Sequence, residues 1–332
     1  MSNPSFEERY AVTLFGFTNE LLLGAQTPLQ ILEQTLASGI TKNVEIDGPQ
    51  FFRNFPNVVD EEVLALCVAL AKFDARLSLL GGYADRASGV TLHSSETVVS
   101  SLIAQLDLVR RLGGFGLRLQ VDAFSIDEAP AIARAAEAAG VMVVFELQGS
   151  MTPTDPRTLA CVEVVRAADS PNVRLMLDSS LFMTCFPPSL QRLMGKTGLS
   201  TSQIAELEEH WLRSDLGEFR TWLIGQLQSG QVPGQVQALM PTFLSRIGHS
   251  KPADWQSFTP MIESVHLKYW DTSDEGGAVT GPTSELIQML ESAGYKGYYC
   301  SEWGGHEWHT LEELSGAQAT SWHKTLVKIL LS

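Results

Sequence analysis

Four side chains that commonly bind metals lie near the ends of four successive apolar runs in the second half of the chain. They are Glu146, Asp178, His266 and Glu302, in the runs GVMVVFELQG, NVRLMLDSS, ESVHLKYWD and GYYCSEWGG. Such runs are typical of strands buried on both faces in parallel sheets. Three carboxylates and an imidazole buried there would be unstable unless a cation held them together. The pattern therefore predicts a metal site at one end of a barrel.

Eight strand-like runs, each followed by a helix-like segment, are available to position these residues. The runs begin at Ala11, Lys42, Arg76, Gly116, Val141, Asn172, Ser264 and Gly297. Many of the amphipathic segments between them begin with Ser, Thr, Asp or an early Pro, and several end on Gly, as helix caps prefer. Eight such units predict a single closed (β/α)8 TIM barrel over residues 1–332.

One connection is much longer than the others. Positions 179–265, which separate Asp178 from His266, amount to 87 residues. Within them, residues 187–260 hold several helical patterns that carry Trp211 and Trp222. We expect an enlarged helical insertion after the sixth strand. Because loops on that side of a barrel frame the active site, the insertion is expected to shape a lid, a substrate cleft or a subunit interface.

Bulk composition argues against several kinds of partner. The 332 residues include 23 Lys plus Arg and 38 Asp plus Glu, for a net charge of -15, so neither nucleic acid nor an anionic membrane is an expected partner. No apolar run reaches the ~18 residues that a membrane span needs, and no export signal is evident. The four cysteines have no CxxC spacing and read as reduced thiols. A cytoplasmic protein is expected.

The order of Glu146, Asp178, His266 and Glu302 along the last four strands resembles the xylose-isomerase-like barrel superfamily. HLKYWD resembles that family's His-x-Lys-Asp strand, and YYCSEWGG resembles its closing Glu strand. The resemblance covers nearly the whole chain in strand order. It implies that the four residues bind one divalent cation, and oxygen-rich ligation with one imidazole favours a hard ion. We expect Mn²⁺, with Mg²⁺ or another divalent ion as the alternative.

Leu181 marks a departure from one branch of this superfamily. Members that cleave phosphodiesters at a multi-zinc site place a histidine three residues after the aspartate that corresponds to Asp178, and here that position is leucine. The middle strands also lack the further histidines of those members. Together with the acidic charge, this argues against a trinuclear nuclease.

The chemistry expected of such a site is proton transfer beside a carbonyl. A divalent cation that binds a sugar carbonyl and a neighbouring hydroxyl stabilises an enediolate, so a base can remove the adjacent proton. Glu146 and Glu302 are the expected proton carriers, as the resemblance implies. Lys268 lies two residues after His266 on the same strand face and is expected to assist. His306, after the last strand, could supply a base.

Three functions remain open. Reprotonation of the enediolate gives an isomerase or epimerase, which is the first expectation. Expulsion of a group β to the carbonyl gives a lyase, as in C-glycoside deglycosidases, whose large subunit belongs to this superfamily and acts on 3-keto-glycosides beside a small subunit. Gln148 departs from the histidine expected in those enzymes. A non-catalytic barrel subunit is the third possibility, although it predicts loss of the ligands. The expected partners are a small sugar or glycoside, and either identical copies or a small second subunit.

Further residues are expected to contact the substrate. They are Trp270, Trp303, Gln148, His309 and Asp122. The two tryptophans could form an aromatic wall against a sugar or aryl ring, although core packing is equally reasonable. Asp122 could bind sugar hydroxyls or cap the following helix. His309 could contact a substrate hydroxyl or lie at the surface.

Overall fold

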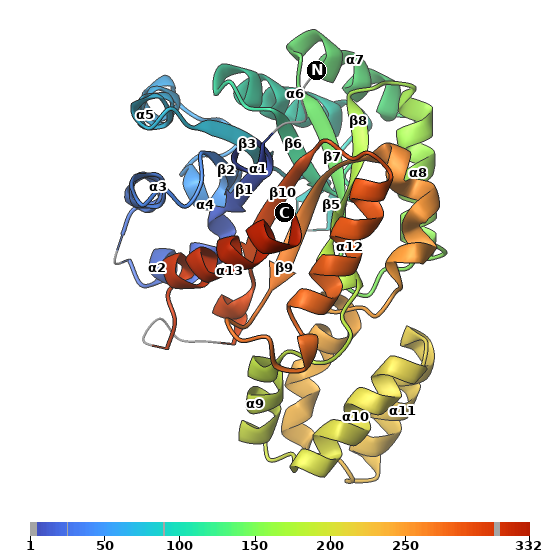
Figure 1. Ribbon diagram of the computed structural model, residues 1–332. Helices are drawn as coiled ribbons and strands as arrows, with labels where there is room; N and C mark the ends of the chain where they lie inside the picture. The colour runs from blue at the N-terminus through green and yellow to red at the C-terminus, as the bar shows by residue number, and fades with distance from the viewer. Residues whose placement is uncertain (1–4, 25, 89, 309–312) are drawn as a thin grey trace.

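The computed structural model describes residues 5–24, 26–88, 90–308 and 313–332. Eight parallel strands close into a barrel in the order β1-β10-β9-β8-β7-β6-β3-β2 (Figure 1). These strands are β1 (Tyr10–Thr13), β2 (Asn43–Asp47), β3 (Arg76–Gly81), β6 (Gly116–Gln120), β7 (Met142–Leu147), β8 (Val173–Asp178), β9 (Ile262–Tyr269) and β10 (Tyr298–Trp303). The predicted barrel is confirmed, and every expected run contributes one of its strands. A small antiparallel pair, β4 (Ala87–Ser88) and β5 (Thr91–Leu92), precedes α6.

Helices cover the outside of the barrel (Figure 1). The longer ones are α3 (Pro28–Ala37), α5 (Asp60–Lys72), α6 (Ser95–Arg111), α7 (Ala129–Ala139), α8 (Pro156–Ala168), α12 (Thr280–Ser292) and α13 (Gly316–Leu330); α1 (Phe6–Arg9), α2 (Thr18–Leu22) and α4 (Gly48–Phe51) are single turns. The side chains of Thr27, Ser94 and Ser315 accept backbone hydrogen bonds at the starts of α3, α6 and α13, which satisfies amides that have no partner within the helix. The helices bury their apolar faces against the strands in the main core.

The interior of the barrel changes from apolar to charged along the strands. Leu79, Val144 and Met176 form a small buried cluster inside it. Side chains two residues apart on a strand face the same way, so the next residues on the inward face after Val144 and Met176 are Glu146 and Asp178. An apolar layer therefore closes the barrel below a layer of charged groups.

Three helices lie between β8 and β9. They are α9 (Pro188–Lys196), α10 (Thr201–Arg213) and α11 (Leu216–Gln228), and the short turns η3 (Gly234–Leu239), η4 (Thr242–Arg246) and η5 (Pro252–Met261) come after them. Figure 1 shows α9, α10 and α11 beyond the end of the barrel at which β9 finishes. Phe186, Trp211, Phe219 and Phe243 belong to an apolar cluster of their own, apart from the main core. This segment therefore has an internal core that fixes its fold.

Two observations concern the whole of the described ranges. Within them, Cys67, Cys161, Cys185 and Cys300 are free thiols, as expected for a reduced protein. Across the same residues, no helix has both the length and the apolar character needed to cross a membrane.

Candidate active site

The four residues singled out as metal ligands meet at one point inside the barrel. Glu146, Asp178, His266 and Glu302 come from β7, β8, β9 and β10, which are neighbours in the barrel. All four are buried, none more than 5% exposed. Each offers one ligand atom, and these atoms lie within 4.8 Å of one another. Parallel register brings them to the same level, since Asp178 pairs with His266 across β8 and β9.

Two carboxylate oxygens at this point are left without a hydrogen-bond donor. Asp178 Oδ1 accepts from the Ser180 amide at 2.7 Å, and Glu302 Oε1 accepts from Lys268 Nζ. Among the described residues, Asp178 Oδ2 and Glu302 Oε2 receive no hydrogen bond, although Glu302 Oε2 touches His266 Nδ1. A buried anionic oxygen without a donor is costly. A cation at this point would satisfy both oxygens, so the donor set fits a metal ion.

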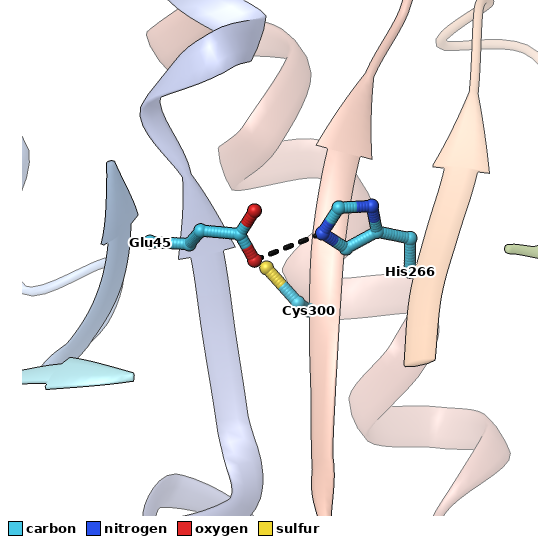
Figure 2. A group of neighbouring side chains, drawn as sticks. All are labelled: Glu45, His266 and Cys300. Atoms are coloured by element: carbon cyan, nitrogen blue, oxygen red, sulfur yellow. Dashed lines mark hydrogen bonds and ion pairs between the residues drawn. The ribbon is translucent and has the colours of Figure 1, made fainter. Parts of the chain in front are cut away.

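His266 and Glu146 are held from outside this group by two further charged residues. Glu146 Oε1 lies 2.8 Å from His266 Nδ1, and Glu146 Oε2 accepts from Arg118 Nη1 at 2.7 Å. On the other side of the ring, His266 Nε2 lies 2.9 Å from Glu45 Oε2 (Figure 2). Arg118 Nε donates to Glu45 Oε1 at 2.7 Å, so Arg118 links the two carboxylates that contact His266. Neither Glu146 nor His266 is free to rotate away from the centre.

The buried charges of this site favour a divalent cation when His266 is neutral. The carboxylates are Glu45, Glu146, Asp178 and Glu302, and the cations facing them are Arg118 and Lys268. A histidine that binds a metal must be neutral, and in that state of His266 four negative charges against two positive leave an excess of two. Uncompensated charge in a buried site is strongly unfavourable. A single divalent ion would balance this set.

The pKa values reflect the same crowding. Burial, reinforced by the Glu302 carboxylate, raises the pKa of Asp178 to about 7. Burial also acts to raise the pKa of Glu302, but Lys268 and His266 outweigh it and hold that pKa well below its ordinary value. Burial acts to lower the pKa of His266, whereas Glu45 and the neighbouring carboxylates raise it well above its ordinary value. Perturbation of this size in one cluster is typical of functional sites.

A cavity of about 380 Å³ opens onto Glu146, His266 and Glu302. Its other walls include Phe15, Asp47, Tyr83, Gln120, Gln148 and Arg246. The two glutamine amides reach toward Glu146 Oε2, each at 3.5 Å. Volumes in this range suit a small ligand, and a few polar groups among apolar walls fix its orientation. The polar groups present here can bind the hydroxyls of a sugar.

Two residues proposed to assist the chemistry lie beside this cavity. Lys268 is 5% exposed, and its Nζ lies 5.3 Å from the ring centre of Phe15. His306 packs edge-on against Phe15, with ring centres 4.8 Å apart, and its Nδ1 lies 3.2 Å from the Trp303 carbonyl oxygen. Burial, together with Lys268, lowers the pKa of His306 to about 4. The structure therefore places His306 behind Phe15 as a neutral imidazole, whereas Lys268 contacts Glu302 directly.

Of the residues expected to contact substrate, Gln148 lies at the cavity, whereas Trp270 and Trp303 do not line it. Trp270 and Trp303 are each 1% exposed and pack in the apolar clusters, where Trp303 Nε1 donates to the Trp270 carbonyl. Trp303 comes directly after the inward-facing Glu302, so strand alternation turns it outward. The aromatic wall of this cavity comes instead from Phe15, in the turn η1 (Leu14–Phe17), and from Tyr83.

Asp122, another expected contact, does not line this cavity. It is exposed and acts electrostatically on Arg157. The alternative role, a cap of the following helix, is not seen either, because α7 has Glu128 at its N-cap and no side-chain cap hydrogen bond. His309 lies outside the described residues.

Sequence reasoning overlooked Arg118 and did not foresee that Glu45 contacts His266. A signal for Arg118 was present, because an arginine interrupts the apolar run GLRLQ of β6 just as a carboxylate interrupts the later strands. Glu45 reaches His266 across the barrel, from a position 221 residues away. No local pattern reports such a contact. Arg246, which reaches the cavity from η4, was equally hidden in the long segment between β8 and β9.

Comparison with known proteins identifies relatives along nearly the whole chain. No family profile matches it. A C-glycoside deglycosidase alpha subunit of Arthrobacter globiformis is 23% identical over 309 residues, which cover 91% of this chain and 86% of that protein. The 3'-dehydrocarminate deglycosidase alpha subunit of a Microbacterium species is 22% identical over 321 residues, 92% of this chain and 90% of the relative. The chain is thus related in sequence to deglycosidase alpha subunits.

Solved structures share the fold. A D-psicose 3-epimerase structure, obtained in the presence of D-fructose, matches with a TM-score of 0.58 and 10% identity, over 97% of this chain and 99% of the other. A structure of the IOLI protein with a zinc atom matches with a TM-score of 0.57 and 12% identity, over 97% and 98% of the two chains. The resemblance to xylose-isomerase-like sugar isomerases and epimerases is confirmed at the level of the barrel, and the named relatives and the epimerase act on sugars.

Proposed function

We propose that the chain is a metal-dependent enzyme that removes a proton beside the carbonyl of an oxidised sugar and then cleaves the carbon–carbon bond of a C-glycoside. The observation that carries this proposal is the convergence of Glu146, Asp178, His266 and Glu302 on one buried point beneath a polar cavity. Similarity to deglycosidase alpha subunits over about nine-tenths of the chain favours bond cleavage as the outcome.

The four convergent residues would hold a divalent ion, for which we propose Mn²⁺. Three carboxylates and one imidazole suit a hard divalent cation, and the neighbour with a bound zinc atom supports a divalent ion in this fold. When bound, such an ion polarises a carbonyl oxygen and makes the adjacent carbon acidic. We propose that side chains of this chain transfer the proton and bind the substrate.

Glu146 and Glu302 are the proposed proton carriers. Each has one oxygen paired with a buried cation, Arg118 or Lys268, and the other oxygen directed at the common point. Pairing keeps both carboxylates ionised, so one of them can accept the proton from the carbon beside the carbonyl. The electron pair left on that carbon forms a double bond to the next carbon as the bond to the aglycone breaks. The aglycone carbon leaves with the bonding pair and takes up a proton.

We propose that Gln120 and Gln148 bind sugar hydroxyls and that Phe15 packs against the ring. All three line the cavity. Arg246 also lines it, and its only described ion-pair contact is Glu307 at 3.6 Å. Its guanidinium thus has donors available for a polar or anionic group of the substrate. Since Arg246 comes from η4, residues 187–260 are proposed as an insertion that frames the mouth of the barrel.

A small second subunit is the proposed partner. The relatives are named as alpha subunits, which implies a further subunit in those enzymes. A second candidate function is an isomerase or epimerase that works without a partner. It is favoured by the fold shared with the D-psicose 3-epimerase. Both candidates need the same proton abstraction, and they differ in whether the deprotonated sugar is reprotonated or loses its aglycone.

The deciding experiment uses the purified, Mn²⁺-loaded chain in D₂O, with a keto-C-glycoside and a panel of ketoses as substrates. Release of the aglycone, observed only when a small co-encoded subunit is added, is the result expected. Interconversion of ketoses without a second polypeptide would establish the isomerase instead. If neither substrate class gains solvent deuterium beside its carbonyl, both candidates are wrong. Glu146→Gln, assayed at saturating Mn²⁺, should lose about 10²- to 10⁴-fold in turnover and exchange, as expected for a general base.

A further inference from the structure

Glu45 lies on the far side of the proposed metal centre from the other carboxylates and was not among the expected ligands. It is 0% exposed and sits in β2, separated from β9 by β1 and β10 in the barrel order. Its Oε2 lies 2.9 Å from His266 Nε2, and its Oε1 accepts from Arg118 Nε at 2.7 Å. Figure 2 shows the Glu45 carboxylate reaching the ring from the opposite wall of the barrel.

We infer that Glu45 is a positioning residue that turns the Nδ1 atom of His266 toward Glu146, Asp178 and Glu302. A carboxylate next to Nε2 keeps a hydrogen on that nitrogen, so Nδ1 is the atom that would give up its hydrogen and offer a lone pair when a metal binds. Nδ1 is also the ring atom that faces Glu146 Oε1, at 2.8 Å. Glu45 thus holds the imidazole ring at Nε2, and Nδ1 faces the proposed metal site.

Arg118 extends this arrangement to a second ligand. Its guanidinium donates to Glu45 through Nε and to Glu146 through Nη1, each at 2.7 Å. A planar guanidinium has a fixed fork of donors, so it holds two carboxylates in a defined relation. Asp47 lies farther away, 4.0 Å from Nη2. Arg118 therefore fixes the position of Glu45, which orients His266, and also the direction of Glu146 Oε1, which faces the proposed metal.

A second metal site at Glu45 is the alternative explanation. Glu45, His266 and Cys300 form a compact buried group, and the Cys300 thiol points to the Glu45 carboxylate in Figure 2. However, both oxygens of Glu45 already have partners, one in Arg118 and one in His266. An ion there would have to displace both contacts. The orienting role keeps both of these contacts in place.

This inference rests on the proposed metal site, and its test measures metal binding rather than turnover. Glu45→Gln removes the charge with almost no change in shape. We expect its Mn²⁺ affinity to fall about 10- to 100-fold, as is common when a group that orients a metal ligand is lost. The visible absorption spectrum of bound Co²⁺, which reports ligand geometry, should also change. The matched control is Ser264→Ala, because Ser264 is buried two residues before His266 on the same face and its Oγ has no hydrogen-bond partner among the described residues.

A second variant, Glu45→Asp, keeps the charge but withdraws the carboxylate by one methylene, and it decides the question if Glu45→Gln does not fold. Weaker Mn²⁺ binding in the folded variants, with wild-type binding in Ser264→Ala, supports the inference. Wild-type affinity and an unchanged Co²⁺ spectrum in either Glu45 variant overturn it, while Glu302→Gln should still lose the metal. A wild-type chain that binds no Mn²⁺ would overturn the metal site itself, so the two failures are distinguishable.

Discussion

Lys268 and Glu302 form an ion pair in which each residue is 5% exposed. Removal of one member of such a pair leaves an uncompensated buried charge, which typically costs about 3–5 kcal/mol. Lys268→Met should therefore destabilise the metal-free protein by about that amount in urea unfolding. Added Mn²⁺ should restore part of the loss, because the ion would take over compensation of Glu302.

The control for this prediction is Lys42→Met. Lys42 pairs with Asp74 at 2.7 Å, but both side chains are largely exposed. Solvent screens such a pair, so this variant should stay close to wild type with or without Mn²⁺. Equal effects of Mn²⁺ on the two variants would contradict the role assigned to Glu302.

At the residue scale, the sequence was informative where charge interrupts an apolar run. Glu146, Asp178, His266 and Glu302 could be found this way because a buried strand gives no other reason for a charged residue. The contact of Glu45 with His266 could not, since it depends on how two distant strands face each other across the closed barrel. For Trp270 and Trp303 the sequence left core packing and substrate contact open for a related reason: position near a strand end does not say which face a side chain takes.

At the scale of elements, the loop after β7 and the turn η4 are held in backbone contact. Gly149 has a φ of 62°, and a Cβ added there would lie 1.8 Å from the Ser245 carbonyl oxygen. The neighbouring Ser150 Oγ donates to the Leu244 carbonyl at 2.7 Å. These contacts fix Gln148 and Arg246 on either side of the cavity. Sequence patterns predicted helices between β8 and β9 but not this junction, which depends on the absence of a side chain at Gly149.

Gly149→Ala should separate the two segments, lower stability and raise the KM for substrate. Gly140→Ala is the matched control, since Gly140 has a φ of 65° but open space around the added Cβ. Its cost should be limited to the backbone strain of about 1–2 kcal/mol. Urea unfolding and steady-state kinetics on both variants make the comparison. Equal losses of stability and an unchanged KM would mean that the close contact is unimportant.

The helix α13 is attached to the barrel through a buried histidine. His323 is 0% exposed, its Nδ1 lies 2.7 Å from Ser301 Oγ, and its ring stacks on Tyr269 with centres 3.8 Å apart. Burial lowers the pKa of His323 to about 3. Between pH 6.5 and 3, His323 therefore binds a proton in the unfolded chain but not in the folded chain. Stability from this group is full above pH 6.5 and is lost as the pH falls through that window.

From that difference we expect a loss of about 2 kcal/mol of unfolding free energy by about pH 5. In His323→Gln, which cannot take up the proton, the unfolding free energy should fall less steeply with acid. Gly140→Ala, which removes no titratable group, should keep the slope of the wild type. Chemical unfolding at a series of pH values measures all three proteins. Parallel curves for His323→Gln and wild type would rule out this source of acid sensitivity.

At the scale of the whole molecule, the proposed metal joins strands β7, β8, β9 and β10 at a single point. An ion that binds only the folded chain stabilises it by about 2.7 kcal/mol at a free concentration of about 100 Kd. We therefore expect the Tm to rise by several degrees when Mn²⁺ replaces EDTA, as measured by scanning calorimetry. Glu302→Gln should lose most of that rise. A Tm that does not respond to Mn²⁺ would contradict a site built from four strands.

The position of Glu302 on β10 also has a consequence for how the protein is made. β10 is the last strand to leave the ribosome, and it pairs with β1, the first, to close the barrel. A nascent chain released before this strand would lack both the closure and a ligand. The proposed metal ion would then meet its full set of ligands only in chains translated through β10, so shorter products of synthesis should bind it more weakly.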